Sequence, residues 1–210
     1  MRLVDEIGKV YDPGSFLDVA RRFGLLYDSL SMMMIRKVFE IFRDCDDKSV
    51  SINLGIRDIK NNELKDYIYS FLATVRHPEN FIFEILENED VDDYQEMVSF
   101  VDKIHKLGGR ISIDDFGSGY SNLQHIASIH SDYIKIDGSI IRNCCEDPES
   151  ENLVALISGW KRLSIRDIKL VAEYVENEDI QRKLNKYDID FSQGYLFSKP
   201  SPEIKDLPEA

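Results

Sequence analysis

The segment RISIDDFGSGYSNLQHIASIHSDYIKID, residues 110–137, decides the fold of this chain. Two isoleucine-rich runs, residues 110–114 and 133–137, have the composition of β-strands. Between them lie a glycine-rich turn and a stretch near residues 122–128 that we expect to form a short helix. Strands joined through a helix form a right-handed βαβ unit, in which the strands are parallel. The segment therefore predicts a parallel sheet covered by helices.

The alternation of strand-like and helix-like segments continues on both sides. Further strands are expected over residues 49–54, 81–85, 168–173 and 188–195. Helices are expected over residues 13–26, 29–43, 62–75 (capped by Asn62), 90–107 and 150–163, and over a last segment ending at Tyr187. Six strands separated by helices predict an α/β fold. A barrel fits better than an open sheet, because no strand is followed by a dinucleotide-type glycine turn, but a complete (β/α)₈ barrel has eight such units.

The composition limits the classes of protein to consider. With 210 residues, 43% hydrophobic and 31% charged, the chain has the size and balance of one soluble globular domain. It has no long apolar run and no signal-like N-terminus, so we expect no membrane span and a cytoplasmic location. The net charge of −13 argues against DNA as a partner, because nucleic-acid affinity depends on basic residues. Cys45, Cys144 and Cys145 lack metal-ligand spacing and are expected to be reduced thiols.

Polar side chains occupy the C-terminal end of every predicted strand, where parallel α/β folds place their reactive groups. In strand order they are Asn53; Glu84 with Glu87; Asp114 and Asp115; Lys135 and Asp137; Glu173 with Glu176; and Gln193. Hard oxygen ligands of this kind suit Mg²⁺, Mn²⁺ or Ca²⁺, and no histidine has the spacing of a zinc ligand. One or two such ions can activate a water for attack on a phosphodiester, with Lys135 stabilising charge or orienting the water.

Several of these residues also have structural interpretations. Asp137 or Glu87 alone could equally be a helix cap or turn residue. Lys135 could be an interior ion-pair partner of Glu173. The turn DDFGSGYSNL lacks the lysine of a phosphate-binding P-loop, and its glycines could simply permit a tight turn. The run Met32, Met33 and Met34 is expected in a helix core. However, a polar side chain at the end of all six predicted strands favours a metal site over these separate structural roles.

Five strings in series, FEILE (83–87), DDFGSGYSNL (114–123), DYIKIDGSII (132–141), LVAEYVE (170–176) and SQGYLFSKP (192–200), resemble the EAL-domain phosphodiesterases of bacterial signalling. The resemblance spans nearly the whole chain. It implies a TIM-type barrel over residues 1–200, followed by a tail over residues 201–210. It also implies Mg²⁺- or Mn²⁺-dependent hydrolysis of cyclic di-GMP to linear pGpG.

The resemblance also implies roles for individual residues. The metal ligands would be Asn53, Glu84, Asp114, Asp115 and Glu173. Lys135 would lie next to the water nucleophile, with Glu173 and Gln193 completing the catalytic set. Glu87 and Glu176 would support the loop over residues 115–121, which in the family links metal binding to dimer contacts. Arg2 and Asp137 would contact the substrate.

The chain departs from the family pattern in three places. The namesake EAL glutamate would fall upstream of residue 1, with residues 1–4 continuing the strand that carries it. The barrel is therefore expected to be truncated or incomplete at its N-terminus. Leu86 stands where the family usually has threonine, and Tyr174 where glycine usually follows the VAE glutamate.

These departures leave three functional hypotheses open: an active phosphodiesterase, a degenerate domain that binds cyclic di-GMP or a protein partner without cutting it, or a fragment of a longer parent with a sensory or GGDEF domain. A missing carboxylate ligand should weaken metal binding, so we expect weak or absent activity in this chain and activity in an intact parent. Open strand edges in an incomplete barrel also predict a homodimer, a swapped segment or imperfect closure.

Overall fold

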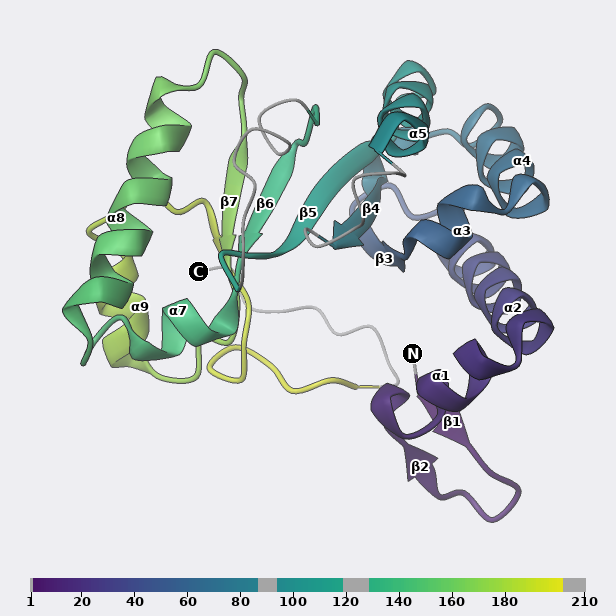
Figure 1. Cartoon of the computed structure of the whole chain (residues 1–210), viewed down its shortest axis with the longest axis horizontal. Helices are drawn as coiled ribbons and strands as arrows, with labels where there is room; N and C mark the ends of the chain where they lie inside the picture. Colours follow the sequence, from purple (N-terminus) through teal and green to yellow (C-terminus); the bar gives the residue numbers. More distant parts are fainter. Residues whose placement is uncertain (1, 87–93, 119–128, 202–210) are drawn as a thin grey trace. The chain divides into compact units, whose positions relative to one another are not determined.

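The computed structural model describes residues 2–86, 94–118 and 129–201 (Figure 1). The chain forms two compact units. The first comprises Met1–Phe83 and Gln95–Gly109, and the second comprises Glu84–Tyr94 and Arg110–Ala210. No helix in the described ranges is both long and apolar enough to cross a membrane.

The first unit contains most of the helices and strands that precede residue 110. Its elements are β1 (Leu3–Val4), β2 (Val10–Tyr11), α1 (Pro13–Arg22), α2 (Gly24–Phe42), β3 (Val50–Leu54), α3 (Ile56–Lys60), α4 (Asn62–Leu72), η1 (Pro78–Asn80), the first half of β4 (Phe81–Leu86) and nearly all of α5 (Tyr94–Lys106). Its core is aromatic: the rings of Phe39 and Phe71 stack with centroids 3.8 Å apart. Phe81 meets both rings edge-on.

The second unit holds the end of β4 and the later βα elements. These are β5 (Arg110–Phe116), β6 (Tyr133–Ile136), α7 (Gly138–Asn143), α8 (Pro148–Leu163), β7 (Lys169–Ala172), α9 (Glu178–Leu184) and β8 (Phe191–Ser192). The order of the sheet is β3-β4-β5-β6-β7-β8, and the pairs β5–β6, β6–β7 and β7–β8 are parallel. This order confirms the predicted parallel α/β architecture.

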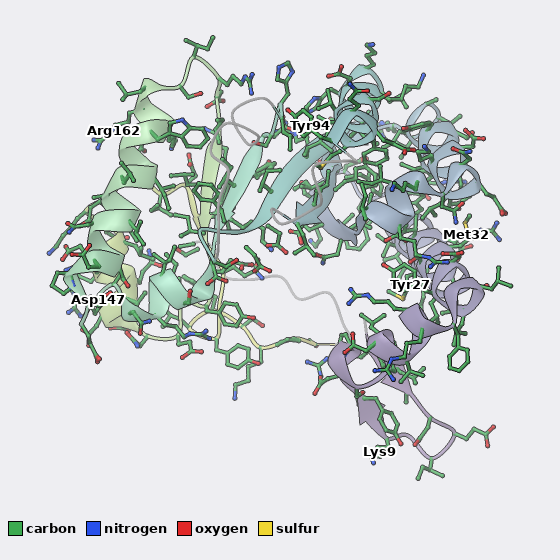
Figure 2. All side chains as sticks on the ribbon, viewed as in Figure 1. Lys9, Tyr27, Met32, Tyr94, Asp147 and Arg162 are labelled. Carbon is green, nitrogen blue, oxygen red and sulfur yellow. The ribbon has the colours of Figure 1, made fainter. Side chains whose placement is uncertain are left out.

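Apolar strands and a well-capped helix hold the second unit together. Ile134 and Leu170, which are register partners on β6 and β7, are both fully buried. Asp147 caps α8 by accepting hydrogen bonds from the backbone N–H groups of Glu149 and Ser150. Figure 2 shows Asp147 and Arg162 at opposite ends of this helix. Acidic residues at the start and basic residues at the end complement the helix dipole.

Several predicted boundaries were wrong for local reasons. The cap of α4 is Asn61, not Asn62: its extended backbone lets its side-chain oxygen accept a hydrogen bond from Leu64 N at 3.2 Å. The second helix begins at Gly24 instead of residue 29. The last strand covers only Phe191–Ser192, because the chain turns at Gly194, whose carbonyl accepts from Phe197 N.

The N-terminal residues also depart from the expectation that residues 1–4 continue a strand of the parallel sheet. Leu3–Val4 instead pairs antiparallel with Val10–Tyr11 in a separate two-stranded sheet. Asp5 forms the turn by accepting hydrogen bonds from the backbone N–H groups of Ile7 and Lys9. Gly8 has φ of +83°, which favours glycine. The expected helix near residues 122–128 and the first residues of the helix over 90–107 lie outside the described residues.

Candidate metal centre and adjoining cavity

Three acidic side chains surround one lysine at the C-terminal ends of neighbouring strands in the second unit. Lys135 Nζ on β6 lies 2.8 Å from Asp114 Oδ1 on β5 and 2.7 Å from Glu173 Oε1 just after β7. Glu84 Oε1 on β4 lies 3.3 Å from the same nitrogen. All four side chains are at most 13% exposed. The predicted strand-end residues therefore meet in one buried charged cluster.

A second acidic residue on β5 completes a group that can hold a cation. Each of Asp114, Asp115 and Glu173 offers one carboxylate oxygen, and these three atoms lie within 4.8 Å of one another. Consecutive residues of a regular strand point to opposite faces of the sheet. Asp115 escapes this alternation because its φ is +56° and the register of β5 with β6 shifts between Ile113 and Phe116. The irregular strand end therefore brings two adjacent carboxylates to one site.

The charges in the cluster are strongly coupled. Burial raises the pKa of Glu173 and, although the ammonium of Lys135 opposes this, the pKa stays above its ordinary value. Burial alone would lower the pKa of Lys135, but the carboxylates of Glu84, Glu173 and Asp114 outweigh it and raise that pKa. Lys135 is therefore an ammonium ion at neutral pH, and it partly neutralises carboxylates that would otherwise repel one another.

The chemistry of this donor set fits a hard divalent cation. Its members are carboxylate oxygens, the ligands preferred by Mg²⁺ and Mn²⁺, whereas a zinc site would typically include histidine or cysteine. Among the described residues, Asp114, Asp115 and Glu173 are the one group with potential ligand atoms this close. The residues present therefore fit the predicted class of metal.

An open cavity of about 410 Å³ adjoins the cluster at Glu173. Glu176 and Gln193, both predicted site residues, also line it. Tyr174, Tyr195, Ser198 and Lys199 contribute further to its wall. Sequence reasoning did not single out the last three as site residues. Their position directly after the last strand, in the string SQGYLFSKP, is the sequence feature that could have identified them.

The remaining predicted residues belong to the first unit, have structural roles or lie outside the described residues. Asn53 is exposed on β3 of the first unit. Arg2, in the same unit, forms an ion pair with Asp12. Asp137 caps α7 by accepting a hydrogen bond from Ser139 N at 2.8 Å, which agrees with its structural interpretation. Glu87 and the end of the loop over residues 115–121 lie outside the described residues.

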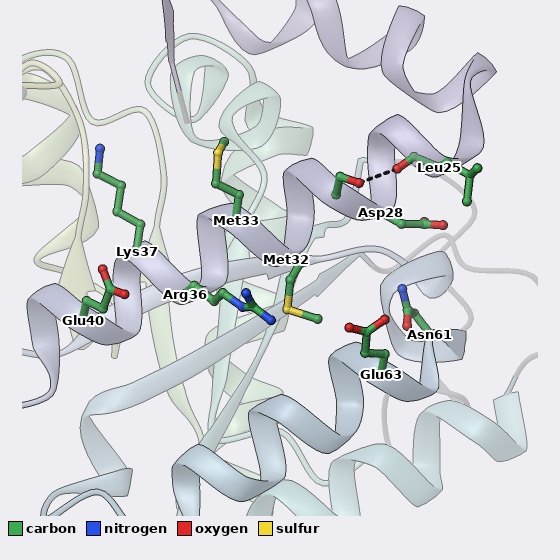
Figure 3. Close-up of a pocket in the computed structure, with 10 residues that line it drawn as sticks. Leu25, Asp28, Met32, Met33, Arg36, Lys37, Glu40, Asn61 and Glu63 are labelled. Carbon is green, nitrogen blue, oxygen red and sulfur yellow. Dashed lines mark hydrogen bonds between the residues drawn. The ribbon is translucent and has the colours of Figure 1, made fainter.

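A second cavity, of about 750 Å³, belongs to the first unit and runs between α2 and the start of α4 (Figure 3). Arg36 and Met32 point toward Glu63, and Met33 is also among the residues that line the cavity. The prediction that Met32, Met33 and Met34 all lie in the core was wrong: Met33 is 55% exposed. Three consecutive helical residues point about 100° apart, so they cannot all face one core.

Comparisons with known proteins agree with this architecture. Residues 1–200 match the family model described as EAL domain. Cyclic di-GMP phosphodiesterase PdeF of Escherichia coli (strain K12) is 32% identical over 214 residues, covering 100% of this chain and 28% of that protein. Cyclic di-GMP phosphodiesterase PdeA of Borreliella burgdorferi is 27% identical over 207 residues, covering 96% of this chain and 30% of that protein. The chain thus spans less than a third of the length of these curated relatives.

A solved structure is similar over most of its length. The PaMucR phosphodiesterase in complex with c-di-GMP aligns with a TM-score of 0.77 and 26% sequence identity, covering 96% of this chain and 83% of that chain.

Proposed function

Because this chain belongs to the EAL domain family, we propose that it hydrolyses cyclic di-GMP to linear pGpG in bacterial second-messenger signalling, in the cytoplasm, with Mg²⁺ or Mn²⁺ as cofactor. The observation that carries this proposal is the buried cluster in which Lys135 contacts Glu84, Asp114 and Glu173 beside Asp115. Residues 1–200 form the proposed catalytic domain, and residues 201–210 its tail.

We assign the metal to Glu84, Asp114, Asp115 and Glu173, with Asn53 as a further ligand. When bound, a divalent cation supplies Lewis-acid stabilisation of phosphate charge and lowers the pKa of a coordinated water. The carboxylates fit this role because they are hard, anionic and held close together by the strand ends.

Lys135 contributes a fixed positive charge to the proposed reaction. Its raised pKa keeps it protonated at neutral pH, and its three carboxylate contacts hold the ammonium in place. A preorganised cation stabilises negative charge that develops on a phosphodiester and costs little reorganisation during reaction. Lys135 also lies within hydrogen-bond reach of Glu173, so this pair can orient an attacking water.

The cavity beside Glu173 is the proposed substrate site. Its volume of about 410 Å³ is within the range of small-molecule sites. Gln193 and Glu176 line it and are assigned to holding water and supporting the site geometry, respectively. We assign Glu87 to loop support as well, and Arg2 and Asp137 to substrate contacts.

A second candidate function is binding of cyclic di-GMP without hydrolysis. The observation that favours it is the bulk of Tyr174, which directly follows Glu173 and is 50% exposed at the wall of the cavity. A homodimer and a sensory or GGDEF domain in a longer parent protein are further proposals, which would couple either function to a signal.

The test measures pGpG formation with Mn²⁺ and cyclic di-GMP, using this chain and a version extended upstream. Glu173→Gln should abolish turnover, whereas Glu146→Gln, an exposed residue distant in sequence from the site, should retain it. Nucleotide binding is measured separately by calorimetry. If both versions bind the nucleotide and neither cuts it, the receptor function stands and the enzymatic one fails. If the shorter chain turns over freely, residues 1–210 suffice for hydrolysis.

A further inference from the structure

A half-exposed aromatic side chain lines the cavity that we propose as the substrate site. Tyr174 directly follows Glu173, is 50% exposed and shares the cavity wall with Glu173 and Gln193. Its φ of +53° is one that non-glycine residues rarely adopt. Backbone strain of this kind destabilises the fold and recurs at ligand sites. A half-exposed ring offsets only part of the strain through packing, which favours a role in binding.

Two residues of α7 fix the position of the ring. A Cβ added to Gly138 would lie 2.2 Å from Cδ2 and 2.7 Å from Cγ of Tyr174, so the end of the ring nearest the backbone packs directly against residue 138. The guanidinium carbon of Arg142 lies 4.7 Å from the ring centroid, close enough for a cation–π interaction. The ring is therefore held in place, and a preorganised ring loses little conformational freedom when a ligand binds to it.

The same cavity contains a second ring with a similar neighbour. Tyr195 is 58% exposed, and Lys199 Nζ lies 5.5 Å from the centroid of its ring. Both residues line the cavity together with Tyr174. Aromatic rings with basic side chains beside them are the elements with which proteins stack nucleobases. The cavity wall therefore fits a ligand that contains flat aromatic rings.

The acidic residues of the wall indicate which part of a nucleotide meets the rings. Glu173 and Glu176 also line the cavity, and carboxylates repel phosphate oxygens unless a cation lies between them. An uncharged base meets no such repulsion. The ring of Tyr174 is therefore suited to a base, whereas the phosphates are suited to the cation-binding group of Asp114, Asp115 and Glu173.

We propose that Tyr174 determines the affinity for the cyclic dinucleotide by stacking one of its bases, with Arg142 as the positioning residue of the ring. The inference rests on the proposed function, because it names a contact of the same substrate in the same cavity. Stacking uses the π-face of the ring and not the phenol hydroxyl. An aromatic replacement should therefore keep the contact, whereas an aliphatic replacement should lose it.

The experiment measures binding of cyclic di-GMP by calorimetry, with EDTA present to prevent metal-dependent cleavage. Tyr174→Leu should weaken binding about tenfold, whereas Tyr174→Phe should bind as tightly as the unmodified chain. The matched control is Tyr187→Leu, because Tyr187 belongs to the same unit but bonds to Glu151 and does not line the cavity. It should leave the affinity unchanged. Thermal melting checks that each variant is folded.

The role of Arg142 is tested through its dependence on the ring. Arg142→Met should weaken binding about threefold, and Arg142→Lys, which keeps a cation, should restore most of it. In the Tyr174→Leu background, Arg142→Met should have no further effect, because the residue acts through a ring that is no longer present. An equal loss in both backgrounds would show that Arg142 does not act by positioning Tyr174.

Fluorescence reports the stacking itself. A cyclic dinucleotide with 2-aminopurine in place of guanine loses fluorescence when its base stacks on an aromatic ring. At saturation, the unmodified chain and Tyr174→Phe should quench this probe more strongly than Tyr174→Leu does. A purely structural role of Tyr174 would change the affinity but leave the quenching of the saturated complex the same.

The outcomes separate this inference from the proposed function, which is tested by pGpG formation with Mn²⁺. Unchanged binding by Tyr174→Leu, or an equal loss in Tyr174→Phe, overturns the stacking even if pGpG is formed. A tenfold loss in Tyr174→Leu alone, without any pGpG, supports the stacking and refutes only hydrolysis. Absence of nucleotide binding by the unmodified chain would overturn both.

Discussion

The ring of Tyr174 occupies the space that a side chain at residue 138 would need: a Cβ added to Gly138 would lie 2.2 Å from Cδ2 of Tyr174. The contact joins the start of α7 to the residue after Glu173. Arg142, further along α7, places its guanidinium 4.7 Å from the centroid of the same ring. Tyr174 itself has φ of +53°, a conformation that non-glycine residues rarely adopt. A strained aromatic residue therefore packs α7 against the backbone that carries a proposed metal ligand.

The first prediction concerns the coupling between these two residues. Gly138→Ala should destabilise the protein by about 1–3 kcal/mol, because the new methyl group overlaps the tyrosine ring. In a Tyr174→Gly background the same substitution should cost less than about 0.5 kcal/mol, because the ring is gone. Urea unfolding of the four proteins measures the coupling. Equal costs in both backgrounds would show that the ring does not occupy this space.

The second prediction separates backbone strain at Tyr174 from packing by its ring. Tyr174→Gly and Tyr174→Ala both remove the ring, but only glycine adopts φ of +53° without a steric penalty. Tyr174→Gly should therefore be more stable than Tyr174→Ala by about 1 kcal/mol, measured by urea unfolding. Ala172→Gly, at a buried strand position with ordinary strand geometry, should show the opposite preference and favour alanine. If Tyr174→Ala is the more stable of the two variants, the backbone at residue 174 is not strained.

The sequence predicted the parallel sheet because β-rich runs and helical segments alternate along the chain. It also predicted which residues stand at strand ends, and four of them, Glu84, Asp114, Lys135 and Glu173, meet in the buried cluster. The two interpretations of Lys135, as an active-site residue and as an ion-pair partner of Glu173, are compatible, because the ion pair lies within the cluster.

Other features depended on backbone detail that a sequence pattern does not contain. Period-two alternation would separate Asp114 from Asp115, and only the left-handed conformation of Asp115 brings their carboxylates together. The hairpin at the N-terminus depends on hydrogen bonds from Ile7 and Lys9 to Asp5. These local hydrogen bonds compete with extension of a strand, and the spacing of apolar residues in the sequence does not predict them.

The third prediction concerns the ammonium ion of Lys135. Lys135→Met should lower the stability of the metal-free protein at pH 7 by about 3 kcal/mol, because buried carboxylates lose their counter-charge. The same carboxylates then attract a divalent cation without competition from the lysine. Saturating Mn²⁺ should therefore raise the melting temperature of Lys135→Met more than that of the unmodified chain. Calorimetry and thermal melting with and without Mn²⁺ measure both effects.

Lys186→Met is the matched control for this substitution, because Lys186 is exposed on the surface after α9. It should change neither the metal-free stability nor the response to Mn²⁺ appreciably. A smaller response to Mn²⁺ in Lys135→Met than in the unmodified chain would mean that the lysine does not compete with a cation for these carboxylates.

The last prediction is a dependence of stability on pH that arises from Asp190, just before β8. Burial raises the pKa of Asp190, but this is outweighed by Lys161 Nζ, 2.7 Å from Oδ2, and by the N–H of Leu170, which donates to the same oxygen at 2.7 Å. The pKa is therefore below its ordinary value in the folded state. Because this pKa is lower in the folded than in the unfolded state, the charged Asp190 stabilises the protein at pH values above its unfolded-state pKa of about 3.9. This stabilisation is lost as the pH falls through the folded-state pKa.

Asp190→Asn should therefore destabilise the protein by about 1 kcal/mol near neutral pH, because it removes charge from hydrogen bonds with Lys161 and Leu170. The difference from the unmodified chain should shrink as pH falls below about 4, because Asp190 of the unfolded chain then takes up a proton, followed at lower pH by Asp190 of the folded protein. Asp179→Asn, in an exposed ion pair with Arg182, should cost little at any pH. Urea unfolding from pH 3 to pH 7 measures both variants. A constant difference for Asp190→Asn across this range would exclude a lowered pKa at Asp190, because only the charged form of the aspartate distinguishes the two proteins electrostatically.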